Sequence, residues 1–214
     1  MRLPFLIEKK LHERLGTFHS IVYLDVKDIH GKIVKSKKMV GHSLTGNFLQ
    51  FLYTNFSEEN VTDYLVSSFN GGSNTNTKST GGPAGSTYQA YMQCHALTND
   101  ASYGIVLGTG VVAPTAFDYI LGVQILNGTG VGQLSHLPQG SSQAPAAVGN
   151  TTSFVLQRLY QNNSGATISP TELGIYIKSP TTGQAILMFR ETFAAVAILA
   201  TQSLTAKVTF EVTT

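Results

Sequence analysis

The chain has 214 residues, a length that suits one large domain or two small ones with a well-filled core. Charged residues make up only 12% of it, where globular proteins have about 25%. The single cysteine excludes an intrachain disulfide and a cysteine-based metal cluster. No apolar run approaches the roughly 20 residues that cross a bilayer, and residues 1–10 lack the pattern of a secretory leader. We therefore expect that the chain does not associate with membranes and that it is made in a reducing cytoplasm.

Charge is distributed unevenly although the net charge is only +2. Residues 1–40 hold nine basic and four acidic side chains, which leaves five basic and eight acidic ones in the rest of the chain. Such a basic segment can contact nucleic acid or an acidic neighbouring subunit, or it can be a solvated hairpin face, and the last interpretation is preferred. Contact with nucleic acid is limited to this segment, because basic residues are scarce around the later tyrosines.

Residues 1–16 combine apolar and charged side chains and can form an arm on a neighbouring subunit or a terminal helix. The segments 19–27 and 32–40 flank the turn Asp28-Ile29-His30-Gly31, which predicts a β-hairpin with Gly31 in the strained position. An amphipathic helix is predicted for residues 43–56. Ser43 is its expected N-cap, and its apolar stripe consists of Leu44, Phe48, Phe51 and Leu52.

The polar, low-complexity residues 69–87 are expected to form a long exposed loop that is mobile or held by a partner. Beyond them the chain is β-like. The expected strands are residues 88–97, 103–108, 124–126, 132–137, 153–161, 171–178, 185–193 and 204–212. Many short strands separated by turn signals are typical of an antiparallel sandwich or barrel. We therefore predict an all-β antiparallel sandwich, jelly-roll-like, in which residues 1–57 pack on a body formed by residues 58–214.

Residues 151–178 give the strongest hairpin pattern of the chain. Two alternating strands flank the turn residues Asn162-Asn163-Ser164-Gly165. Glu172 is interpreted as a charge at the edge of a strand, because neither an acid nor a histidine lies near it in the sequence.

The run Gly108-Thr109-Gly110-Val111-Val112-Ala113 matches a loose dinucleotide-binding pattern. That function requires a helix to begin here and an acidic residue about 20 positions later. Pro114 interrupts such a helix and no suitable acid follows, so a turn that ends a strand is the preferred interpretation. No cofactor is expected.

Two places in the sequence contain residue types used in nucleophilic catalysis. The run Gly41-His42-Ser43-Leu44-Thr45 resembles a hydrolase nucleophile elbow, and Asp100 or Asp118 and then His136 follow in the expected order. Thr45 replaces the required second glycine, so helix capping by Ser43 is preferred. Cys94 and His95 are neighbours on an expected strand and face opposite ways, which favours a buried structural thiol over a Cys–His dyad. The histidines show no metal-ligand spacing. We therefore predict no catalytic and no metal-binding residues.

Three longer segments carry a resemblance to a known class of proteins: residues 104–125 (GIVLGTGVVAPTAFDYILGVQI), 158–177 (RLYQNNSGATISPTELGIYI) and 186–212, which begins ILMFRETF. Together with the hairpin turn and the start of the predicted helix, they resemble β-rich structural virion proteins of tailed bacteriophages. These proteins lie on capsids or in head–tail and tail assemblies. The resemblance implies a non-enzymatic subunit of the virion, made in the host cytoplasm, with other virion proteins and further copies of itself as partners. A tail-tip module that binds a receptor or carbohydrate is the alternative, and a hydrolase that uses Ser43 is a remote one.

Two groups of residues follow from these interpretations. The expected subunit-interface residues are Leu3, Phe5, Leu6, Leu11, Leu15, Tyr88 and Tyr91. The expected turn and core residues are Gly31, Phe48, Leu52, Gly108, Gly110, Asp118, Tyr119, Arg158, Gly165, Gly174, Tyr176 and Arg190.

Overall fold

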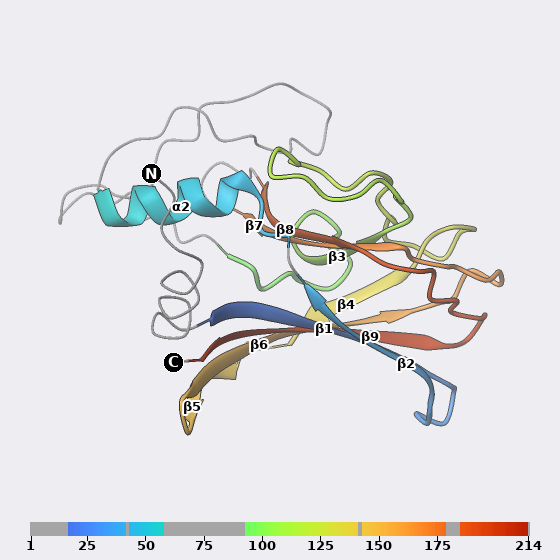
Figure 1. Cartoon of the computed structure of the whole chain (residues 1–214). Coiled ribbons are helices and arrows are strands. Elements are labelled where there is room, and N and C mark those ends of the chain that lie inside the picture. The colour runs from blue at the N-terminus through green and yellow to red at the C-terminus, as the bar shows by residue number, and fades with distance from the viewer. Residues whose placement is uncertain (1–16, 42, 58–92, 141–142, 179–184, 214) are drawn as a thin grey trace.

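The structure is a computed structural model that describes residues 17–41, 43–57, 93–140, 143–178 and 185–213. The interface residues expected in the segments 1–16 and 88–91, and the expected loop 69–87, lie outside these ranges. These residues form an antiparallel β-sandwich of two sheets with one short helix, as predicted (Figure 1). The described part of the chain holds no helix long and apolar enough to cross a membrane.

The larger sheet has the order β2-β1-β9-β6-β4, with β5 also paired to β6. Its strands are β1 (Thr17–Lys27), β2 (Ile33–Gly41), β4 (Ser135–Gln139), β5 (Gln143–Val148), β6 (Thr151–Gln161) and β9 (Ser203–Thr213). The smaller sheet has the order β3-β7-β8, with β3 (Gly104–Gly108), β7 (Glu172–Lys178) and β8 (Ala185–Thr192). The helix is α2 (Gly46–Ser57).

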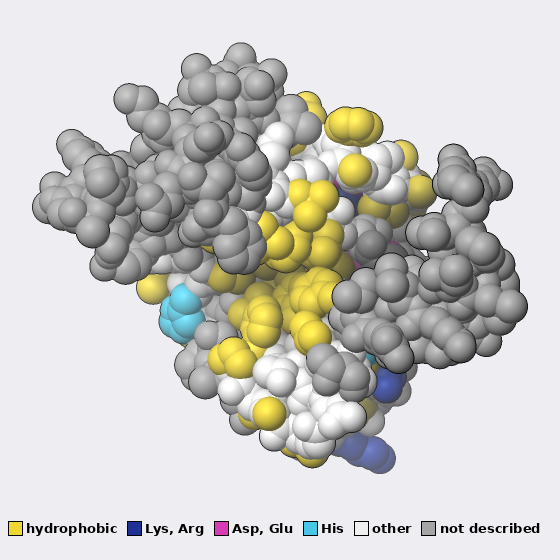
Figure 2. All heavy atoms as spheres, turned by 60° about the vertical axis from the view of Figure 1, so that its left-hand side comes forward, with side chains coloured by type: hydrophobic (Ala, Val, Ile, Leu, Met, Phe, Trp, Pro, Cys, Tyr) yellow, Lys and Arg dark blue, Asp and Glu magenta, His cyan; other side chains and the backbone are white. Residues whose placement is uncertain are grey.

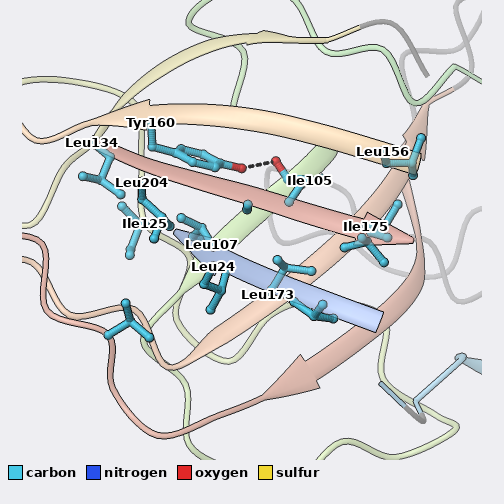
Figure 3. Packing of buried hydrophobic residues seen from close by; sticks show 14 of the residues in the cluster. Leu24, Ile105, Leu107, Ile125, Leu134, Leu156, Tyr160, Leu173, Ile175 and Leu204 are labelled. Atoms are coloured by element: carbon cyan, nitrogen blue, oxygen red, sulfur yellow. Dashed lines mark hydrogen bonds between the residues drawn. The ribbon is translucent and has the colours of Figure 1, made fainter. Parts of the chain in front are cut away.

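The main core lies between the two sheets (Figure 3). Alternate residues of the long strands point inward, as in Val22, Leu24 and Val26 of β1, which are fully buried. From the smaller sheet, Leu107 and Leu173 meet them. Burial of an apolar side chain of this size stabilises the fold by about 1.5–3 kcal/mol, so this layer is the main source of stability.

The first hairpin is confirmed. β1 and β2 pair antiparallel, and the N–H of Gly31 donates to the carbonyl of Asp28 at 3.0 Å. Gly31 has φ +80°, a conformation that side-chain-bearing residues rarely adopt. β1 also pairs with β9 over its whole length, so the hairpin contributes directly to the core.

The second predicted hairpin is wrong. β6 pairs with β9, β4 and β5 in the larger sheet, whereas β7 pairs with β3 and β8 in the smaller one. Residues 162–171 therefore carry the chain from one sheet to the other. The turn itself is present, with Gly165 at φ +74°. Asn162 is fully buried and fixes the crossing, because its amide group donates to the carbonyls of Ala166 and Ile198 at 2.7 and 2.8 Å.

The predicted helix begins later than expected, at Gly46, and Ser43 does not cap it. Residues 43–45 instead run along the edge of β8: the carbonyl of Ser43 accepts from the N–H of Arg190, and Leu44 pairs with Phe189. Thr45 donates its hydroxyl to the carbonyl of Leu187 at 2.6 Å. These contacts satisfy the uncovered edge of the smaller sheet and delay the helix by three residues.

Other expected strands are partly corrected. Residues 94–97 form no strand, and Gln124 makes only an isolated bridge to Gly108. The strand expected at 132–137 lies at 135–139, and β5 was not predicted. The sequence Gln143–Val148 contains Pro145 and three alanines, so it lacks the β-branched alternation that identifies a strand.

Candidate functional site: a loop held by buried charges

The most distinctive feature of the smaller sheet is the loop of residues 109–124, which follows β3. The strand ends at Gly108, as the preferred interpretation of the glycine-rich run predicted, and no helix begins there. The loop returns over the outer side of the smaller sheet, where it appears in green (Figure 1). Leu121 packs there with Val106, Tyr176 and Leu187 in a second apolar cluster.

Glu172 of β7 is fully buried beneath this loop, so its interpretation as a charge at a strand edge was wrong. Its Oε1 accepts the backbone N–H groups of Gly110 and Val123 at 2.8 and 2.9 Å, and its Oε2 accepts that of Gly122 at 3.0 Å. Gly110, the one residue of the glycine-rich run among these donors, thus binds a carboxylate of the same chain with its amide.

The two glycines of the Gly108-Thr109-Gly110 run are explained by this carboxylate. A Cβ on either residue would lie 2.4 Å from Oε1 of Glu172, closer than any real contact. Gly174 is constrained similarly on the outer face, where a Cβ would lie 2.9 Å from side-chain carbons of Leu121 and Leu187. The glycines therefore allow a close approach of backbone to a buried charge.

Arg190 of β8 completes the cluster. Its Nε and Nη2 lie 3.0 and 2.9 Å from Oε2 of Glu172, and its Nη1 donates to Oδ2 of Asp118 at 2.7 Å. Burial opposes the charge of Arg190, but the hydrogen bonds to Asp118 and Glu172 outweigh it and raise the pKa of the guanidinium. Burial alone would raise the pKa of Asp118 as well. Hydrogen bonds from Thr115 and Arg190 outweigh that effect and lower it.

Further contacts fasten the loop along its length. The carbonyl of Val112 accepts from Nη2 of Arg190 at 3.0 Å, and the N–H of Leu121 donates to the hydroxyl of Tyr176 at 2.8 Å. The first residue of α2, Gly46, donates its N–H to the carbonyl of Ala116 at 2.7 Å. The backbone of the loop is therefore fixed from β7, β8 and α2.

Apart from Leu121, the large apolar side chains of the same loop face solvent. Six large apolar side chains are 44–80% exposed: Val111, Val112, Phe117, Tyr119, Ile120 and Val123. Val112 and Val123 combine both features of the loop: their backbone groups bind the ion cluster, and their side chains point outward. The loop thus displays apolar groups from a rigid backbone, an arrangement suited to binding another protein surface.

A second buried polar cluster centres on Arg158 of β6, which is fully buried. Its guanidinium donates to five backbone carbonyls, those of Leu97, Asp100, Tyr103, Ile105 and Leu137. It thereby ties the loops beside β3 and β4 to the larger sheet. Five directed donors match the capacity of a guanidinium, so Arg158 has a structural role.

Tyr160 and His136 lie next to Arg158. The hydroxyl of Tyr160 donates to the carbonyl of Ile105 at 2.6 Å (Figure 3), and its burial raises the pKa of the phenol. His136 is 1% exposed and packs edge-on against Tyr160. Neither of its ring nitrogens has a hydrogen-bond partner among the described residues. Burial, and secondarily the charge of Arg158, lower the pKa of His136 to about 4.

The residues considered for hydrolysis are not arranged as a triad. Within the described ranges His136 bonds to neither a serine nor a carboxylate. Asp118 binds Arg190, and Asp100 binds Ser102 and Lys178. Cys94 packs against the core, and burial raises the pKa of its thiol. Among the described residues no group of three or more side chains could hold a metal ion.

The predicted turn and core residues differ in how deeply the structure buries them. Arg158, Tyr176 and Arg190 are buried, Phe48 packs on β8, and Leu52 is half-buried. Tyr119 is not a core residue, because it is 46% exposed on the loop. Glu172, Gln139 and His136 are buried polar residues whose structural role the sequence did not predict, and the predicted turn residue Asn162 is buried as well.

No protein-family model, no curated protein and no solved structure matches the chain. The resemblance to phage virion proteins therefore stays a prediction.

Proposed function

We propose that the chain is a structural subunit of a bacteriophage virion, present in many copies, that contacts a neighbouring virion protein through residues 109–124. The observation that carries this proposal is the set of six exposed apolar side chains on a backbone fixed by Glu172, Arg190 and Asp118. The sequence resemblance supports the same class of protein.

Physical chemistry favours this use of the loop. A binding segment that is already ordered loses little conformational entropy on association, so more of its contact energy appears as affinity. Single exposed apolar residues are normal on any protein. Six of them within the sixteen residues of this fixed loop form an exposed apolar patch, and such patches mark interaction surfaces. A body with few charges can also be buried between subunits with little desolvation of ions.

The competing functions have less support in the described residues. The tyrosines that would favour a receptor-binding or carbohydrate-binding tip lie outside the described ranges. The hydrolase alternative requires a histidine that activates Ser43, and both ring nitrogens of His136 are without a hydrogen-bond partner among the described residues.

The test uses particles of the virus that encodes the chain. Quantitative mass spectrometry of purified particles should find the chain in many copies, and its absence would overturn the proposed function. The double variant Val112→Ser, Phe117→Ser should fold normally but enter particles several-fold less efficiently. Val148→Ser is the matched control, since Val148 is equally exposed but lies on β5. Normal incorporation of the double variant would exclude the loop as the contact while leaving the virion role intact.

A further inference from the structure

At one end of the sandwich, the described residues leave apolar side chains of the core face partly exposed. The inward-facing rows of β1, β9 and β6 meet β8 at Phe210, whose ring centroid lies 6.1 Å from that of Phe189, and they continue one row further. Phe18 pairs with Val212, and Ser20 pairs with Phe210, which in turn pairs with Phe154. Phe18 and Val212 are 48% and 41% exposed although they lie on the core face.

A row of phenylalanine rings lines this end of the sandwich. Ring centroids of Phe48 and Phe18 lie 6.3 Å apart, those of Phe18 and Phe210 6.1 Å, and those of Phe210 and Phe154 5.0 Å. We call Phe18, Phe48, Phe154, Phe210 and Val212 the aromatic mouth. Figure 2, which brings the left-hand side of Figure 1 forward, shows hydrophobic side chains gathered in the middle of this face. Helix α2 contributes Phe48 from one side and the larger sheet contributes the others.

We propose that the aromatic mouth is the binding site of the chain's own N-terminal segment, residues 1–16, whose apolar side chains close the core. Three observations support this occupant: its point of attachment, its composition and the size of the mouth. The inference is independent of the 109–124 loop and of the virion role.

The attachment point lies at the mouth itself. Residue 16 directly precedes Thr17, the first residue of β1, and Phe18 is the second. Sixteen residues reach up to about 50 Å when extended, several times the spacing between the rings. A tether this short gives an effective concentration in the millimolar range, so even weak binding keeps the mouth covered.

Composition and size favour this segment over a second globular partner. Residues 1–16 contain Leu3, Phe5, Leu6, Leu11 and Leu15, enough apolar surface to cover the rings. A specific protein–protein interface buries about 800 Å² on each partner. Two half-exposed side chains and three better-covered rings offer on the order of 200 Å², since a whole aromatic side chain has 150–250 Å². That area suits a few apolar side chains.

Disulfide trapping in the full-length chain tests the contact directly. In a Cys94→Ala background, Leu11→Cys combined with Val212→Cys should form an intrachain disulfide under mild oxidation, as shown by non-reducing peptide mass spectrometry. Leu11→Cys with Val131→Cys is the control, because Val131 is highly exposed but lies in the turn before β4. Equal trapping of both pairs would overturn the proposal. A disulfide that forms only between chains would overturn it in favour of the segment of a second copy.

A second variant measures exposure of the mouth. Full-length Leu11→Asp, Leu15→Asp should bind a fluorescent apolar dye several-fold more strongly than the parent. A peptide of residues 1–16 should reverse this with a Kd below about 1 mM, the effective concentration of the tether. The same peptide with both leucines replaced by aspartate should not reverse the dye binding. Unchanged dye binding, or equal competition by both peptides, would contradict the proposal. If this variant does not fold, the disulfide experiment alone decides the question.

Discussion

Glu172 and Arg190 form an ion pair across paired strands, with Nε and Nη2 of Arg190 at 3.0 and 2.9 Å from Oε2 of Glu172. Their positions are diagonal, since Glu172 pairs with Thr192 and Arg190 with Gly174. The missing side chain of Gly174 leaves room on the outer face for Leu121, so the pair and the loop above it fit together. A buried pair with every oxygen bonded stabilises one arrangement of the loop and disfavours others.

Glu172→Gln should lower the free energy of unfolding by about 3–5 kcal/mol, the cost of breaking a buried pair. The carboxylate receives donors from Gly110, Gly122, Val123 and Arg190. A neutral amide would turn its own N–H groups toward some of them. Urea denaturation followed by circular dichroism measures the change.

The control is Glu211→Gln, because Glu211 pairs with His19 at 2.8 Å in a partly exposed position. Exposed pairs contribute about 0–1 kcal/mol. Equal effects of the two substitutions would show that the buried cluster has no special role.

Gly110→Ala should lower the free energy of unfolding by about 1–3 kcal/mol, the usual effect of overpacking a core. The new Cβ would lie 2.4 Å from Oε1 of Glu172, a group that its hydrogen bonds prevent from moving. Gly140→Ala is the matched control: its Cβ would lie 3.6 Å from the carbonyl of Gln157, an ordinary contact. Thermal unfolding of both variants should separate them, and a neutral Gly110→Ala would refute the role of that glycine.

Arg158→Lys should lower the free energy of unfolding by on the order of 3 kcal/mol. An ammonium group has three donors, so it cannot bind all five carbonyls that the guanidinium binds. The reverse exchange at the exposed Lys38, Lys38→Arg, should be nearly neutral. Denaturant titration compares the two. A small loss for Arg158→Lys would mean that water can replace the guanidinium at these carbonyls.

The long strands could be predicted from the sequence because their signal is local. β1, β6 and β9 alternate apolar and polar residues, and that pattern follows directly from one buried face. Which strands pair is not a local property. Residues 162–165 indicate that the chain turns, but nothing near them shows that β7 joins the other sheet, since Glu172–Tyr176 are buried on both faces.

The ion cluster could not be predicted for the same reason. Arg190 lies 18 positions after Glu172 in the sequence, and the amide of Gly110 lies 62 positions before it. The spacing of Gly108 and Gly110 was the available signal, but it indicates only that backbone approaches something closely. The cofactor pattern and the buried carboxylate require the same glycines, and only the fold distinguishes them.

Acidification should destabilise the protein through His136, whose pKa is lowered to about 4 by burial and by Arg158. The unfolded chain binds a proton at about pH 6.5, so between these values the unfolded state holds more protons than the folded one. Stability from this group is fully present above pH 6.5, falls as the pH drops toward 4, and changes no further below it. The total is roughly 3 kcal/mol, at about 1.4 kcal/mol per pH unit.

His136→Phe should remove this contribution and keep the edge-on packing against Tyr160. The measurement is the free energy of unfolding from pH 7.5 to 4, compared between parent and variant. The two curves should converge or cross as the pH falls, because only the parent loses stability through this side chain. His30→Phe is the control, since His30 lies in the exposed turn of the first hairpin. Parallel curves for parent and His136→Phe would show that the ring does not titrate differently in the two states.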